Sequence, residues 1–321
     1  MTNVWQNLKP PIFCLAPMFG ATDSAFRQLL AKIGKPDLMF TEFTNVQAIY
    51  SPDTKTLIRQ LSFFKTEKPL ICQIWGLDPE LFEQAAGLIV KLGFDGVDIN
   101  LGCPEKAVIK KHAGAALINN KPLVKQIIQS AKIGTAGKIP VSAKIRLGLD
   151  KIETTSWVKF LLKLNLDALI IHCRTAKAMS SGPAHWEEIA KAVKIRNQLK
   201  INTLIIGNGD IFSRADAFAK ITASGVDGVM IGRGVFKDPY IFHHHDSITA
   251  KSPREKLELL LQHLSVYDKT WGSLKPYHPL KRFFKIYVNG FSGALALRQQ
   301  LMATASLLQA RQLINSYNIH R

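Results

Sequence analysis

Short, nearly continuous apolar runs alternate with longer amphipathic stretches from the N-terminus to about residue 240. Most of the short runs are apolar at successive positions, which is typical of parallel strands covered on both faces. Eight of them are predicted as strands, at residues 12–16, 38–43, 70–75, 96–100, 141–146, 168–173, 203–207 and 228–231.

The stretches between these runs have helical patterns, and some have recognisable ends. The helix predicted over 23–33 begins at Asp23, a capping residue, and the one over 78–92 has Pro79 in its first turn and Gly93 just past its end. Further helices are predicted over 122–132, 154–164, 185–198 and 214–223, and a less regular candidate spans 50–64. Eight β/α units in about 240 residues predict an α/β protein with a (β/α)8 TIM barrel. A doubly wound open sheet is the competing architecture.

The strand pattern stops at about residue 251, and helices are predicted over 254–271, 280–288 and 294–315. We therefore expect a barrel at 1–245 and a small all-helical C-terminal domain at 246–321. Asp268 is the last acidic residue of the chain, and eight basic residues follow it. Because solvated helix faces usually mix the two signs, this stretch favours a surface that binds a polyanion.

The charge of the whole chain points the same way. Lys and Arg number 42 against 24 Asp and Glu, a net charge of +18. Such an excess favours nucleic acid, because neutralising phosphates releases condensed counterions, although a generally basic surface is the alternative. The polar N-terminus is unlike a signal peptide, and no apolar run approaches the about 20 residues that a membrane span needs. We therefore expect a cytoplasmic protein without membrane contact.

No metal site is predicted. The four cysteines show no C-x-x-C spacing, and the adjacent His243, His244 and His245 are poorly placed to converge on one ion. No feature points to a protein partner, and a monomer is expected.

Polar residues gather at the ends of the predicted strands, where (β/α)8 barrels carry their chemistry. They are Gln73, Asn100, Lys144, Arg146, His172 and Arg174. Lys144 and Arg146 are two residues apart and should share one strand face, as should His172 and Arg174. Charged groups in a barrel mouth are costly without a partner, so the set predicts an anionic, hydrogen-bonding ligand.

Two glycine-containing turns follow the last two predicted strands, at Asn208-Gly209-Asp210 and Gly232-Arg233-Gly234. This is the usual phosphate position of the fold. Glycines let backbone N–H groups approach phosphate oxygens, and an arginine adds a charged donor. Ordinary tight turns are the alternative for each alone, but the pair favours phosphate.

Cys103 lies in a turn between Gly102 and Pro104, with cationic neighbours that could tune its thiol. It could act as a nucleophile, a redox thiol or a proton donor, or it could be a structural loop cysteine. A phosphate-bearing cofactor, an amide-rich strand end and a thiol suit flavin chemistry, with hydride from the flavin and a proton from the thiol.

These motifs, in this order, resemble the tRNA-dihydrouridine synthase family. The matching segments are 15–18 with Thr22-Asp23, 98–104, 113–117, 144–146, 172–174, 208–210 and 232–234. The Asp-Ile-Asn-Leu-Gly-Cys-Pro segment at 98–104 is the specific one, whereas the glycine turns alone are weak. The similarity spans residues 12–240, and the helical tail fits the family's tRNA-binding domain. Residues 110–114 and the tail weakly favour the bacterial B-type branch of the family.

The resemblance implies an FMN-containing barrel that uses NADPH to reduce the C5=C6 bond of a uridine in the D-loop of tRNA. Cys103 would give a proton to C5 of the uracil while the reduced flavin delivers hydride to C6. The FMN would be surrounded by Pro17, Met18, Phe19, Gln73, Lys144, His172, Asn208, Gly209, Asp210, Gly232 and Arg233. The flipped base or the rest of the tRNA would meet Asn100, Arg146, Arg174, Lys281, Arg282 and Lys285, and Lys144 and His172 would reach the base or its phosphate as well. Phe19 stands where family members more often carry a small residue, and the tail matches more loosely than the barrel.

Two other functions remain open on the sequence. One is a small-molecule FMN oxidoreductase resembling dihydroorotate dehydrogenase, which the basic tail disfavours because a free pyrimidine needs no polyanion surface. The other is a non-catalytic RNA-binding barrel, which an absence of bound flavin would favour.

Overall fold

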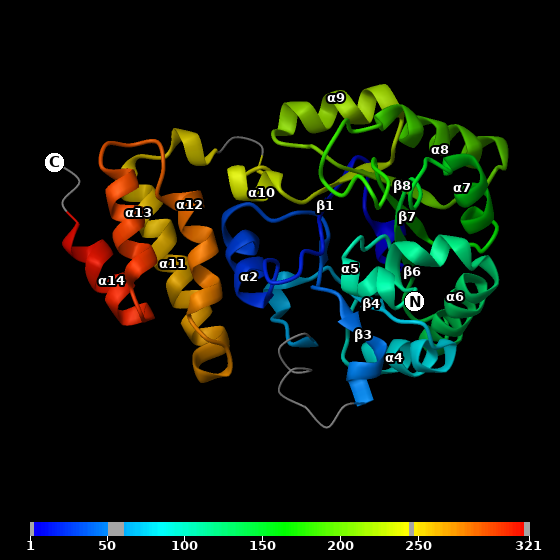
Figure 1. The fold of residues 1–321 in the computed structure, drawn as a ribbon, viewed down its shortest axis with the longest axis horizontal. Coiled ribbons are helices and arrows are strands. Elements are labelled where there is room, and N and C mark those ends of the chain that lie inside the picture. The colour runs from blue at the N-terminus through cyan, green and yellow to red at the C-terminus, as the bar shows by residue number, and fades with distance from the viewer. Residues whose placement is uncertain (1–2, 51–60, 244–246, 318–321) are drawn as a thin grey trace.

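The computed structural model describes residues 3–50, 61–243 and 247–317. Eight parallel strands form its barrel, in the order β1-β9-β8-β7-β6-β5-β4-β2. A bridge between Cys14 and Leu38 joins β1 back to β2, and the Leu15 N–H donates to the Leu38 carbonyl at 2.9 Å. The predicted TIM barrel is confirmed (Figure 1).

The strands lie where the apolar runs predict them. They are β1 (Ile12–Leu15), β2 (Met39–Phe40), β4 (Leu70–Trp75), β5 (Gly96–Leu101), β6 (Val141–Arg146), β7 (Ala168–His172), β8 (Leu204–Asn208) and β9 (Gly228–Ile231). The run at 38–43 is the exception, because only β2 is regular there, and the short β3 (Thr44–Asn45) follows and pairs with β4. Between them Glu42 turns to the β1–α2 loop, where its carboxylate accepts the Ala21 N–H at 3.1 Å.

Helices surround the barrel as predicted. They are α2 (Ser24–Ile33), α4 (Pro79–Lys91), α6 (Lys121–Thr135), α7 (Thr154–Leu162), α8 (Trp186–Gln198) and α9 (Arg214–Ser224). Shorter helices are α1 (Val4–Asn7), α5 (Lys106–Lys110) and α10 (Gly234–Lys237). The Asp23 side chain caps α2 by accepting the Phe26 N–H at 3.0 Å. The candidate helix over 50–64 falls mostly outside the described residues.

Two apolar cores explain the nearly continuous apolar strands. One face of each strand points into the barrel, where Cys14, Phe40, Ile170 and Met230 pack together, and Trp5 of α1 joins them, 1% exposed. The opposite faces pack against the surrounding helices in a larger core. Because both faces are buried, both must be apolar.

The C-terminal segment is helical, as predicted, but its breaks differ. It contains α11 (Pro253–Trp271), α12 (Phe284–Tyr287), α13 (Ala294–Ala303) and α14 (Leu307–Ser316). The helix predicted over 294–315 is two helices, because Thr304 is extended and Ser306 caps α14 by accepting the Gln309 N–H at 3.2 Å. The helix predicted over 280–288 is a 3-10 segment, η6 (His278–Phe283), followed by the single turn α12. None of the described helices is long and apolar enough to cross a membrane.

The tail packs closely on α2, which lies between it and the barrel (Figure 1). Phe26 of α2 stacks on Phe283 with ring centroids 5.0 Å apart. Asp23 accepts hydrogen bonds from Trp271 Nε1 at 3.0 Å and from Lys275 Nζ at 2.6 Å. Side chains of both parts belong to one apolar core, so the barrel and the tail form a continuous interior. The division at residue 246 stays a prediction.

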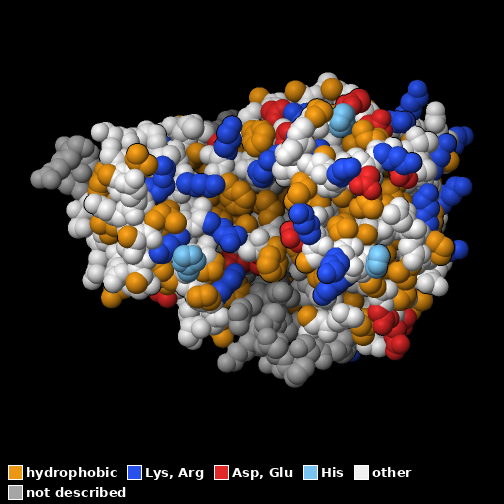
Figure 2. Space-filling view, viewed as in Figure 1, with side chains coloured by type: hydrophobic (Ala, Val, Ile, Leu, Met, Phe, Trp, Pro, Cys, Tyr) orange, Lys and Arg blue, Asp and Glu red, His pale blue; other side chains and the backbone are white. Residues whose placement is uncertain are grey.

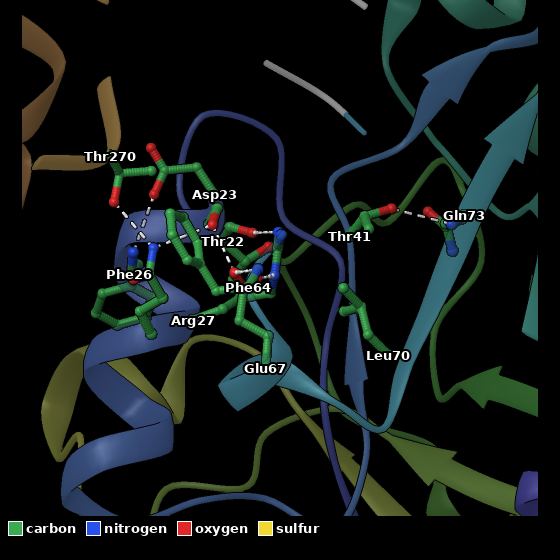
Figure 3. Close-up of polar contacts among 12 residues, drawn as sticks. Thr22, Asp23, Phe26, Arg27, Thr41, Phe64, Glu67, Leu70, Gln73 and Thr270 are labelled. Carbon is green, nitrogen blue, oxygen red and sulfur yellow. Dashed lines mark hydrogen bonds and ion pairs between the residues drawn. The ribbon is translucent and has the colours of Figure 1, made fainter. Parts of the chain in front are cut away.

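A buried ion pair holds α2 in place beside this interface (Figure 3). Arg27 Nε lies 2.7 Å from Glu67 Oε2, and the two side chains are 2% and 0% exposed. Glu67 also accepts from Ser24 Oγ at 2.6 Å and from the Phe64 N–H at 2.7 Å. Arg27 donates to the Thr22 carbonyl at 2.7 Å. The pair therefore also fixes one end of the β1–α2 loop, whose other end reaches the barrel mouth.

Candidate active site

A pocket opens at the carboxyl ends of the barrel strands. It encloses about 880 Å³ when the space of its open mouth is included. Of the predicted FMN residues, it is lined by Pro17, Met18, Gln73, Lys144, His172, Asn208, Gly209, Asp210, Gly232 and Arg233. Cys103, Asn100 and Arg146 line it as well, whereas Phe19 and Arg174 are not among its lining residues.

A chain of hydrogen bonds orders the amide side chains on one wall. Asp98 accepts from Ser142 Oγ at 2.6 Å and from Gln73 Nε2 at 2.7 Å. Gln73 Oε1 in turn accepts from Asn100 Nδ2 at 2.9 Å. Burial raises the pKa of Asp98 to about 6. Asp98 was missed from the sequence as a site residue, although it begins the most specific motif.

Asn100 shapes the turn that carries Cys103. Its Oδ1 accepts the N–H groups of Gly102 at 3.1 Å and Cys103 at 2.9 Å. Gly114 packs against this turn with φ +59, and a Cβ there would lie 2.9 Å from the Cys103 carbonyl oxygen. Only glycine meets both conditions without strain.

The Cys103 thiol is partly buried, and this sets its protonation state. Burial raises the pKa of the thiol, and the nearby Arg146 and Lys144 only partly oppose the effect. The thiol therefore stays protonated at neutral pH. Among the roles left open by the sequence, this state favours a proton donor over a thiolate nucleophile.

Lys144 and Arg146 both reach the pocket from β6, as their spacing predicts. Lys144 Nζ donates to Asn208 Oδ1 at 2.9 Å, and burial lowers its pKa to about 8, with the charge of Arg146 acting in the same direction. Arg146 Nε donates to the Gly102 carbonyl at 3.0 Å. Arg146 thus lies against the Cys103 turn, and Lys144 against the end of β8.

His172, the last residue of β7, presents a neutral imidazole to the pocket. Burial lowers its pKa to about 2, and the charges of Lys144 and Arg146 act in the same direction. Its Nδ1 is buried and has no hydrogen-bond partner among the described residues. An unpaired buried polar atom costs about 1–3 kcal/mol. A ligand atom in the pocket could satisfy it.

Arg174 does not share the pocket with His172, contrary to the spacing argument. The strand ends at His172, and the Arg174 N–H folds back to the His172 carbonyl at 2.8 Å, so the alternation of faces stops there. The 3%-exposed Arg174 side chain instead donates to Asp210 Oδ1 at 3.0 Å and to the Gly182 carbonyl at 2.7 Å. Its hydrogen bonds hold the loops at Gly182 and Asp210 together, and its predicted contact with tRNA stays a prediction.

The two glycine turns lie at the pocket wall, in the position predicted for phosphate. Gly209 has φ +131, and a Cβ there would lie 2.1 Å from Cys173 Sγ. Arg233 is half exposed at the mouth and donates to Asp210 Oδ1 at 2.5 Å. Phe212 lies beside it, with Lys237 Nζ 4.9 Å from the ring centroid. Gly209 is therefore required by its backbone conformation and by the packing of Cys173, and Arg233 places a guanidinium group at the mouth.

Several lining residues were not predicted. They are Phe43, Gly102, Pro104, Ser180, Ile211, Phe212 and Met230. Phe43 follows the second strand, and Phe212 follows the Asn-Gly-Asp turn after β8. Their position just after a strand is the sequence feature from which both could have been predicted. Ser180 lies on a loop whose sequence carries no recognisable motif. Phe19, which was predicted to contact FMN, is 65% exposed and packs on Phe43, with ring centroids 5.4 Å apart.

The three predicted tRNA contacts of the tail differ in their surroundings. Lys281 Nζ donates to the Met302 carbonyl at 2.7 Å, and Arg282 donates to the Gly20 carbonyl of the barrel at 2.6 Å. Lys285 is exposed, and its ammonium group has no partner within the described part of the chain. Figure 2 shows basic side chains over both the tail and the barrel on one face. Some basic side chains in the stretch after Asp268 therefore form hydrogen bonds within the protein as well as contributing to its charge.

Within the described residues, no group of three or more His, Cys, Asp or Glu side chains is placed to hold a metal ion. His244 and His245 lie outside the described residues. The fold and the pocket define a TIM-barrel enzyme whose pocket is lined by a thiol after β5 and by two glycine turns after β8 and β9. Its particular family follows from comparison with known proteins.

A sequence profile of the dihydrouridine synthase (Dus) family matches residues 14–320. A probable tRNA-dihydrouridine synthase of Staphylococcus aureus (strain COL) is 41% identical over 323 residues, covering 98% of this chain and 95% of the relative. The probable tRNA-dihydrouridine synthase 2 of Bacillus subtilis (strain 168) is 41% identical over 318 residues, covering 98% and 96%. The chain belongs to the dihydrouridine synthase family.

Solved structures share the barrel at much lower identity. A morphinone reductase variant in complex with tetrahydroNAD superposes with a TM-score of 0.52 at 12% identity, covering 75% of this chain and 89% of the other. The 6-hydroxypseudooxynicotine amine oxidase of Pseudomonas geniculata gives 0.54 at 14% identity, covering 73% and 47%. At these identities the likeness shows the fold alone.

Proposed function

We propose that this dihydrouridine synthase reduces the C5=C6 bond of a uridine in the D-loop of tRNA, with FMN as bound cofactor and NADPH as electron source. The observation that carries the proposal is the position of the Cys103 thiol, on a turn that Asn100 holds in a pocket at the barrel mouth. The family match and the names of the relatives support the reaction and the tRNA substrate.

The residues of the pocket fit FMN. Lys144 offers a donor to a flavin ring, Met18 offers an apolar surface, and the unpaired Nδ1 of His172 needs a polar partner. The phosphate suits the two glycine turns, where backbone N–H groups and Arg233 are at hand. FMN, when bound and reduced by NADPH, would supply the hydride that is added to C6 of the uracil.

Cys103 supplies the proton that C5 receives, so that one hydride and one proton complete the reduction. Transfer leaves a thiolate, and the positive charges of Lys144 and Arg146 lower its energy. Asn100 keeps the turn in position through its two backbone hydrogen bonds. The thiolate then regains a proton from water at the open mouth.

The substrate base must leave its stack to reach this pocket. The net charge of +18 and the basic face shared by tail and barrel favour a tRNA over a free pyrimidine. Family membership favours a catalytic barrel over a passive RNA-binding one. Monomeric state and cytoplasmic location stay predictions.

The purified protein is expected to be yellow and to release FMN on denaturation. With NADPH and an unmodified tRNA transcript, it should form dihydrouridine, which mass spectrometry of nuclease digests detects. A colourless protein that takes up no added FMN would contradict the flavin assignment. Yellow protein that leaves the transcript unmodified would contradict the substrate assignment.

Lys285→Glu is expected to weaken tRNA binding, because the exposed ammonium group lies in the acid-free tail and has no partner within the described part of the chain. Loss of one phosphate contact should reduce the slope of log K against log salt by about 1. Filter binding at several salt concentrations measures both. Lys138→Glu is the matched control, since it makes the same charge change just before β6, at the opposite end of the barrel. Equal effects of the two variants would show that only net charge matters.

A further inference from the structure

Three aromatic side chains form a row at the edge of the pocket mouth. Phe19 is 65% exposed, its ring centroid lies 5.4 Å from that of Phe43, and Phe43 lies 6.3 Å from Trp75. Phe43 lines the pocket, whereas Phe19 stands outside it. We call Phe19, Phe43 and Trp75 the aromatic shelf.

The exposure of Phe19 is not a consequence of a loose loop. On one side, the Met18 N–H donates to Thr22 Oγ1 at 2.9 Å. On the other side, the Ala21 N–H donates to Glu42 at 3.1 Å, and Arg282 donates to the Gly20 carbonyl at 2.6 Å. The loop is therefore fixed from both the barrel and the tail, and it holds a large apolar ring in solvent.

The shelf lies where the barrel meets the basic tail. Arg282 comes from the tail, reaches the residue next to Phe19 and remains exposed. Figure 2 shows apolar surface between the basic side chains of the tail and those of the barrel. An aromatic face with a cationic group beside it matches a nucleotide, whose base stacks and whose phosphate is anionic.

We propose that Phe19, backed by Phe43, stacks on the nucleobase next to the uridine that enters the pocket, with Arg282 facing a neighbouring phosphate. The inference rests on the proposed function and names the part of the tRNA that this surface holds. Extruding a base leaves its neighbour without a stacking partner, and an exposed ring at the mouth replaces the lost contact. Stacking tolerates any base, so Phe19 contributes affinity without reading sequence.

Because Phe19 stands outside the pocket, its effect belongs to tRNA binding and not to the chemical step. Phe19→Ala is expected to raise the KM for tRNA by about 5- to 150-fold, the range that loss of one stacked base implies. The single-turnover rate at saturating tRNA should change little. The flavin spectrum and the rate of NADPH oxidation with dioxygen should match the wild type.

Matched substitutions separate stacking from simple packing on Phe43. Phe19→Tyr keeps the aromatic face and should keep the wild-type KM. Phe19→Leu keeps apolar bulk without that face and should behave like Phe19→Ala. Ile133→Ala removes another exposed apolar side chain, 62% exposed near the end of α6, and should leave the KM unchanged.

Three results would overturn the inference. They are an unchanged KM for tRNA in Phe19→Ala, a wild-type KM in Phe19→Leu, and a rise in the KM for NADPH in place of that for tRNA. The last would assign the shelf to the nicotinamide cofactor. Failure of the proposed function is distinguishable, because the wild-type enzyme itself would then form no dihydrouridine.

Discussion

Cys103→Ala is expected to lower the single-turnover rate of dihydrouridine formation by about 10²–10⁴-fold, the usual contribution of a positioned general acid. FMN binding, tRNA affinity and flavin reduction by NADPH should persist, because the thiol serves only the proton transfer. Quantifying dihydrouridine against time with pre-reduced enzyme measures the effect. A wild-type rate in this variant would remove Cys103 from the mechanism.

The pH dependence of the same step tests the protonation state. Burial raises the pKa of the Cys103 thiol, so the active, protonated form persists through neutral pH. The rate should be level there and fall as pH rises through the raised pKa. Lys144, whose pKa is lowered to about 8, could also produce an alkaline decline. Cys103→Ser separates the two: a decline that survives in this variant belongs to Lys144, and one that disappears belongs to the thiol.

Glu67→Ala is expected to lower the free energy of unfolding by about 3–5 kcal/mol, the usual cost of removing one partner of a buried ion pair. The variant leaves Arg27 buried at 2% exposure without its counter-charge. It also removes the acceptor for Ser24 Oγ and the Phe64 N–H (Figure 3). Urea unfolding of FMN-free protein measures the change without the stabilisation that a bound ligand adds.

The double variant Arg27→Met with Glu67→Met is the control. It removes both charges and fills similar volume with apolar atoms, so it should recover most of the loss. A double variant as unstable as Glu67→Ala would show that the hydrogen bonds of Glu67, and not the unpaired charge of Arg27, carry the cost. A single variant of wild-type stability would contradict the assignment of the pair as a structural element.

The barrel could be predicted from the sequence because its signal is local and repeated. Strands such as β4, β6 and β9 are buried on both faces, so their apolar runs coincide with the strands themselves. The fold fixes where strand ends meet, so residues at those ends were predicted to converge without knowledge of contacts. Gln73, Lys144, His172 and Asn208 do line one pocket.

The structure of the tail was harder to predict. Its hydrophobic pattern indicates helices, but it does not show where one helix ends and the next begins, or which elements they pack against. A period of 3.6 continues through Thr304 to Ser306, where side-chain capping ends one helix and begins another. The charge pattern predicted a basic surface, yet Lys275 forms an ion pair with the buried Asp23 of the barrel. Charge counts along a chain cannot distinguish a cation that faces solvent from one that closes an interface.

The sequence by itself determined the barrel, the position of the pocket and the residue types at its mouth, because periodicity and strand ends are properties of neighbouring residues. Only the tertiary structure decided which partners those residues take. It paired Arg174 with Asp210, connected Asp98 to Gln73 and Asn100, and turned Phe19 out of the pocket onto Phe43. Each of these outcomes joins segments far apart in the chain, and burial and hydrogen bonding across elements select among partners that the sequence leaves equivalent.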